Sequence, residues 1–148
     1  MAAFVINEWL WADSIGNNGA DRQRDAFSVL TKLSASDHQI VVVVGSAFDQ
    51  KAWKLCNSHN AVVVGIARIY VSAIRLNSSR CLLVKPEALE PLPAGLATSV
   101  KPDDHYLVQA QLSVNGAILI TTDLPLRDAA TAAGLPCLTR DEFLQTYF

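Results

Sequence analysis

Residues 101–143, KPDDHYLVQAQLSVNGAILITTDLPLRDAATAAGLPCLTRDEF, decide the fold because helical and strand patterns alternate in them with turn signals between. The run 117–120 is short and wholly apolar, which predicts a strand covered on both faces. Asn115-Gly116 marks the end of the preceding helix, and Asp123 follows the end of the strand. The pattern therefore indicates an α/β crossover.

The segment after Asp123 continues this alternation. Pro125 suits the first turn of a helix, which is expected to end at Gly134. Residues 135–138 form another short strand candidate, and Thr139 and Glu142 have the spacing of a capping box for a last helix. The order of elements in the whole stretch is therefore helix, strand, helix, strand, helix.

The chain before residue 101 is also expected to alternate strands with helices. Apolar and β-branched runs predict strands, the first of them central, and amphipathic or apolar segments predict helices. We expect strands at 3–6, 39–44 and 80–84, helices at 21–33, 47–56 and 61–76, and a connection with one helical turn at 86–98. Together these predict a single domain over residues 1–148, a three-layer α/β/α sandwich with a central, mainly parallel sheet.

Composition excludes several classes of protein. Of the 148 residues, 51% are hydrophobic and 18% charged, so the chain is expected to fold around a sizeable core. The net charge of −2 argues against a general electrostatic grip on nucleic acid. Cys56, Cys81 and Cys137 have neither disulfide nor zinc spacing, which favours a reducing, cytoplasmic compartment.

The sequence offers no membrane anchor and few catalytic motifs. The N-terminus lacks the pattern of a signal peptide, and the longest apolar region, 61–74, is too short to span a bilayer and contains Arg68. No glycine-rich phosphate loop or nucleophile elbow occurs, and the three histidines lack ligand spacing. Trp9 and Trp11 are either core residues or a platform for stacking bases.

Acidic residues stand where strands stop and helices start. In parallel sheets the ligand crevice lies beyond the carboxyl ends of the strands, so these side chains are candidates for a common site. Oxygen-only ligands favour Mg²⁺ or Mn²⁺, although an aspartate at a helix start is also a common cap. The candidates are Asn7, Glu8, Asp49, Asp103, Asp104 and Asp123.

The stretch from Asp103 to Phe143 resembles the PIN-domain family, with its acid-led helix, a strand ending in Thr-x-Asp, a short helix and a late strand. The resemblance implies that the first acidic position falls on Asn7, with Glu8 beside it. The second falls on Asp49, the third on Asp104 or its neighbour Asp103, and the fourth on Asp123. Asn7 departs from the family, because an amide removes one negative charge from the cluster.

The resemblance implies metal-dependent cleavage of RNA, with Mg²⁺ or Mn²⁺ held by these residues. It also leaves open a catalytically impaired fold that binds RNA or protein, a toxin role with a small antitoxin-like partner, and a homodimer. A receiver-like domain is disfavoured, because no lysine follows residue 101. The candidate contacts to RNA phosphates are Arg22, Arg24, Lys54, Arg68 and Arg75.

Overall fold

The computed structural model describes all residues, Met1–Phe148, and its centre is a five-stranded sheet in the order β3-β2-β1-β4-β5. Every pair of neighbouring strands is parallel, and β1 is the central strand as predicted. The strands are β1 (Ala3–Ile6), β2 (Gln39–Val43), β3 (Cys81–Val84), β4 (Ile118–Ile120) and β5 (Cys137–Leu138).

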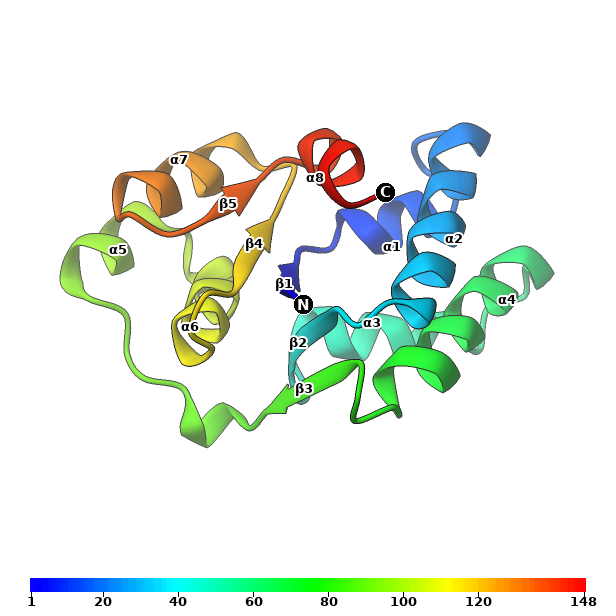
Figure 1. Ribbon diagram of the computed structural model, residues 1–148, viewed down its shortest axis with the longest axis horizontal. Helices are drawn as coiled ribbons and strands as arrows, with labels where there is room; N and C mark the ends of the chain where they lie inside the picture. Colours follow the sequence, from blue (N-terminus) through cyan, green and yellow to red (C-terminus); the bar gives the residue numbers. More distant parts are fainter.

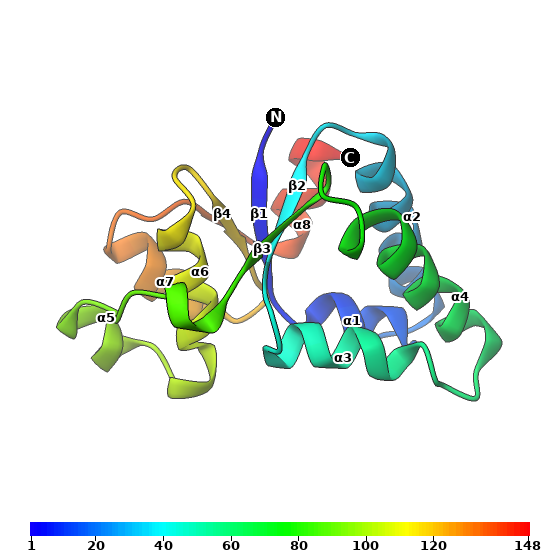
Figure 2. The ribbon, with the colours of Figure 1, turned by 90° about the horizontal axis from the view of Figure 1, so that it is seen from below.

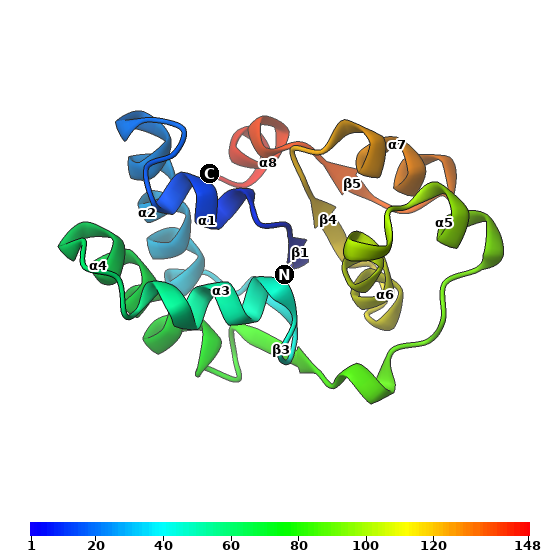
Figure 3. The same cartoon turned by 180° about the vertical axis from the view of Figure 1, so that it is seen from behind.

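Helices cover both faces of this sheet. Figures 1 and 3 show α5, α6 and α7 on one side and α1 to α4 with α8 on the other. The predicted three-layer α/β/α sandwich is therefore confirmed. The helices are α1 (Trp9–Ser14), α2 (Ala20–Ala35), α3 (Ala47–Leu55), α4 (Ala61–Tyr70), α5 (Ala94–Ser99), α6 (His105–Ser113), α7 (Leu124–Ala132) and α8 (Arg140–Tyr147).

The side chains of the central strand alternate between two hydrophobic cores. Phe4 and Ile6 belong to the larger core, under the α1–α4 and α8 layer, and Val5 belongs to the smaller core on the other face. Trp9 and Trp11 are 7% and 1% exposed within the larger core. Their burial favours core packing and leaves no exposed ring face for stacking a base.

The C-terminal stretch forms the predicted elements, with shorter strands. The expected capping box is present: the Thr139 hydroxyl accepts from the Glu142 amide, and the Glu142 carboxylate accepts from the Thr139 amide. On α2, Phe27 is 45% exposed, whereas Val29 is 1% exposed and belongs to the core.

Residues 61–76 form one helical segment in which α4 continues into a π-helical turn, Val71–Arg75. Arg75, one of the candidate phosphate contacts, turns inward to Asp49, with only 10% of its side chain exposed. No helix has both the length and the apolar character that crossing a membrane requires.

The parallel strands bring their carboxyl ends to one edge of the sheet. Figure 2 shows α1 and α3 leaving this edge, where α6 also begins. Asn7 follows β1, Gly45 follows β2 and Thr121 follows β4. The candidate residues are therefore found along this edge.

Candidate functional site

Three carboxylates reach the edge of the sheet from the starts of three helices. Asp123 is the N-cap of α7, where its side chain accepts from the Leu126 amide at 3.2 Å. Asp104 precedes α6 at the end of a 3-10 turn, and Glu8 precedes α1. We call Glu8, Asp104 and Asp123, with the neighbouring Asp103, the acid group.

The charges of the acid group act on one another. The pKa of Asp104 is raised, first by burial and next by the Asp123 carboxylate, with smaller contributions from Asp103 and Glu8. Lys101 opposes the shift. Of the two adjacent aspartates, Asp104 is half-buried and Asp103 is exposed, so Asp104 is the one that faces inward.

Asn7 ties the ends of the two central strands together instead of presenting its amide to the acid group. Its Nδ2 donates to Thr121 Oγ1 at 3.0 Å, and its Oδ1 accepts from the Glu8 amide at 2.7 Å. If the strand continued through residues 7 and 8, the side chains of Asn7 and Glu8 would face opposite sides of the sheet. The strand ends at Ile6, however, and Glu8 has helical backbone angles, which bring its charge within reach of Asp104.

Asp49 occupies a different environment from the acid group. Arg75 Nε donates to Asp49 Oδ1 at 2.7 Å and Arg75 Nη2 donates to Oδ2 at 3.2 Å, while the Gly45 amide donates to Oδ2 at 2.9 Å. The Asp49 side chain is 4% exposed. Asp49 is not among the charges that act on Asp104, so the structure does not bring it together with the acid group.

The donor chemistry of the acid group fits a hard divalent cation. All of its side-chain donor atoms are carboxylate oxygens, and the pKa of Asp104 is raised by burial and by the Asp123 carboxylate, two costs of its negative charge that a bound cation would offset. No group of three or more histidine, cysteine, aspartate or glutamate side chains is placed to hold a metal ion. Mg²⁺ commonly uses one or two carboxylates and keeps several waters, which is a set that Asp104 and Asp123 can supply.

Sequence reasoning missed two side chains next to the acid group. Burial raises the pKa of the Tyr106 phenol, and the charges of Glu8 and Asp104 add to the shift. Thr121 joins Asn7 to Asp123, since its Oγ1 also accepts from the Asp123 amide at 3.0 Å. The only sequence signal for them was their position: Tyr106 follows Asp104 by two residues, and Thr121 precedes Asp123 by two residues.

Replacing Asp104 with asparagine should raise the midpoint of thermal unfolding at pH 7. Folding raises the pKa of Asp104, so its contribution favours folding below its ordinary pKa of about 4 and is lost as the pH rises through the folded-state value. An amide removes this cost, and the difference should vanish below about pH 4. Thermal melts across pH measure it. Asp128→Asn, on an exposed carboxylate, is the control. An unchanged midpoint at pH 7 would contradict the crowding of carboxylates.

Comparison of the chain with protein-family models, with curated proteins and with solved structures found no match. The functional argument therefore depends on the chain's own residues and their arrangement.

Proposed function

We propose that the chain is a PIN-like, metal-dependent endoribonuclease whose site is the acid group at the carboxyl ends of β1 and β4. One observation carries the proposal: Asp104, Asp123 and Glu8 come from three helix starts, and the pKa of Asp104 is raised first by burial and next by the Asp123 carboxylate, with Glu8 adding to the shift. A carboxyl group whose pKa is raised by burial and by neighbouring charges is typical of functional sites.

In this proposal Asp104 and Asp123 would hold Mg²⁺ or Mn²⁺, with Glu8 and Asp103 beside them. The bound ion would activate water and stabilise the negative charge that develops on the scissile phosphate. The Asn7–Thr121 hydrogen bond fixes the two strand ends, and thereby the separation of Glu8 from Asp123. Asp49 would contribute only if it left Arg75.

A second candidate is a catalytically impaired PIN-like fold that binds RNA or protein. Two observations favour it. Asn7 is neutral where the family resemblance implies an acid, and Arg75 neutralises Asp49. Only the acid group then remains to hold an ion. A fold of this kind would keep the edge of the sheet as a binding surface without turnover.

A role as the toxin of a toxin–antitoxin pair, in the cytoplasm, belongs to the same proposal. An apolar groove of about 320 Å³ between α2 and α4, lined by Phe27, Val62 and Ile66 among others, supports a protein partner. Phe27 is 45% exposed and Val62 is 57% exposed. A small antitoxin-like protein or a second copy of the chain would cover these apolar side chains.

RNA cleavage with Mn²⁺ by wild type, Asp104→Asn and Asn7→Asp tests the proposal. Removing even an outer partner of a metal ligand typically costs 10–100-fold in activity, so Asp104→Asn should lower cleavage by at least about 100-fold. Asn7→Asp should raise cleavage or Mn²⁺ affinity by adding a carboxylate, and the Thr121 hydroxyl can donate to it. Gel assays of a labelled RNA give the rates, and EDTA should abolish them.

The three proteins separate the two candidates. Equal cleavage by all of them would contradict a carboxylate mechanism. RNA that is bound by wild type without cleavage, and cleaved only by Asn7→Asp, would support the impaired fold.

A further inference from the structure

A polar pocket of about 280 Å³ is formed by residues of α2 and residues at the starts of α7 and α8. It is lined by Arg22, Thr122, Leu124, Thr139, Arg140 and Asp141. Thr122 and Leu124 flank Asp123 in the chain, and the Arg140 guanidinium lies 5.9 Å from the ring centre of Trp9, which follows Glu8. An RNA strand with a phosphate at the acid group could therefore place a neighbouring nucleotide in this pocket.

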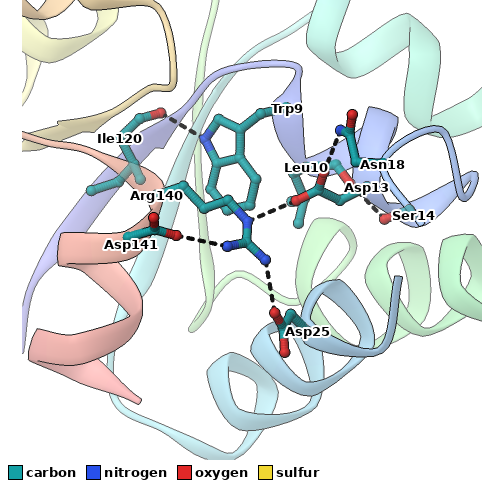
Figure 4. A network of polar contacts seen from close by, with 9 residues as sticks. All are labelled: Trp9, Leu10, Asp13, Ser14, Asn18, Asp25, Ile120, Arg140 and Asp141. Carbon is teal, nitrogen blue, oxygen red and sulfur yellow. Dashed lines mark hydrogen bonds and ion pairs between the residues drawn. The ribbon is translucent and has the colours of Figure 1, made fainter. Parts of the chain in front are cut away.

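The two arginines of the pocket differ in their partners. Figure 4 shows that each guanidinium nitrogen of Arg140 has a carboxylate partner: the three nitrogens donate to Asp13, Asp25 and Asp141 at 2.8–2.9 Å. Arg22 is half-buried and takes part in no hydrogen bond or ion pair. Arg22 is therefore the cation that remains available to a ligand.

The surrounding charges argue against a phosphate group as the ligand. Arg140 and its three carboxylate partners together carry a formal net charge of −2, so a phosphate in the pocket would meet negative charge that Arg22 only partly offsets. A neutral group that both accepts and donates hydrogen bonds avoids this repulsion. Arg22 supplies donors, the second carboxylate oxygen of Asp141 supplies a free acceptor, and the Thr122 hydroxyl can do either.

We propose that this pocket binds a guanine base of the RNA, an inference that rests on the proposed function. Guanine offers O6 and N7 as acceptors, for which arginine is the commonest specific partner, and N–H donors on its Watson–Crick edge that suit a carboxylate. Adenine presents an acceptor, N1, where guanine presents a donor, and would be repelled by Asp141. Unstacked bases of single-stranded RNA are commonly read in this way.

The test is a titration of the ¹⁵N-labelled protein with guanosine and with adenosine, which carry no phosphate and require no cleavage. Guanosine should shift the backbone amide signals of Thr122, Thr139 and Asp141, and should bind roughly 10-fold or more tightly than adenosine. Arg22→Gln should remove this preference. Arg24→Gln is the matched control, because Arg24 lies two residues along the same helix and pairs with Asp21.

Cleavage of a randomised RNA with Mn²⁺ separates this inference from the proposed function. Equal binding of the two nucleosides, with RNA still cleaved, would overturn the guanine pocket alone. Guanosine bound at the pocket with no RNA cleaved would overturn the nuclease alone. Inorganic phosphate that shifts the same signals more strongly than guanosine would also contradict the guanine pocket.

Discussion

Replacing Arg140 with methionine should lower the free energy of unfolding by about 3–5 kcal/mol, the usual cost of removing one partner from a buried ion pair. The Arg140 side chain is 6% exposed, and its Nε donates to Asp13 Oδ2 at 2.8 Å, where Asp13 is fully buried. Without Arg140, the only other side chain bonded to Asp13 is Asn18, at 2.7 Å. The variant leaves the buried Asp13 charge with the Asn18 hydrogen bond and no cation.

Urea unfolding followed by tryptophan fluorescence measures this loss, since Trp9 and Trp11 lie in the core beside the ion pair. Arg127→Met is the matched control. Arg127 pairs with its neighbour Asp128 at the surface, and an exposed pair of this kind contributes about 0–1 kcal/mol. An Arg140→Met variant within about 1 kcal/mol of wild type would show that the ion pair is not what holds α8 against α1 and α2.

The combination of Arg140→Met with Asp13→Leu refines the test. Replacing a whole buried ion pair with apolar side chains is often close to neutral, so the double variant should be more stable than Arg140→Met alone. Asp25 and Asp141 lose little in either variant, because their side chains are 51% and 75% exposed and water can take the place of Arg140.

The elements of the fold were predictable because each is encoded by a local pattern. The run 117–120 and the segment 39–44 are apolar and short, as buried parallel strands are, and helix caps and glycines mark the boundaries between elements. Glu8, Asp104 and Asp123 were predicted for the same reason, since the ends of parallel strands meet at one edge of the sheet.

The buried ion pairs were not predictable, because they join residues that look ordinary in their local context. Arg140 and Asp13 are 127 residues apart, and Asp25 is a half-exposed residue of α2. Asp49 stands in the first turn of α3, where an acid is favoured by the helix dipole alone. Charged residues are seldom buried unless paired, and the sequence does not show which partner the fold supplies.

The assignment of the metal site depends in the same way on contacts between residues that are distant in the sequence. The PIN resemblance places four residues around one ion, but the structure divides them between two environments. Asp104 and Asp123 share the acid group with Glu8, whereas Asn7 bonds to Thr121 and Asp49 bonds to Arg75. Whether Asp49 takes part in function is therefore decided by the strength of its bond to Arg75.

Replacing Arg75 with methionine should lower the free energy of unfolding by about 3–5 kcal/mol, because Asp49 would keep its charge in a site where only 4% of its side chain is exposed. The Asp49 carboxylate would keep only the hydrogen bond that it accepts from the Gly45 amide. The nearby Tyr70 hydroxyl is buried and has no hydrogen-bond partner, so it does not stabilise the Asp49 charge in the folded protein. Chemical unfolding measures the loss. Arg68→Met, in the same helical segment but without an ion-pair partner, is the control.

Asp49→Asn should destabilise the protein less than Arg75→Met. An amide can still accept from the Gly45 amide, and Arg75, which is more exposed than Asp49, keeps its contact with the Trp53 ring at 5.8 Å. In the Mn²⁺ cleavage assay, Asp49→Asn should stay within a few-fold of wild type, because Asp49 is held away from the acid group. Asp104→Asn should show the opposite combination, with higher stability and lost cleavage.

This crossed result would separate a residue that maintains the fold from one that serves the site, since no general loss of folding can raise stability in one variant while abolishing its activity. If Asp49→Asn instead abolished cleavage while the protein stayed folded, Asp49 would have to leave Arg75 when RNA and metal bind. The Arg75 pair would then oppose activity, and Arg75→Met would lose stability and gain cleavage. Equilibrium unfolding and cleavage measured on the same preparations of each variant distinguish the two arrangements.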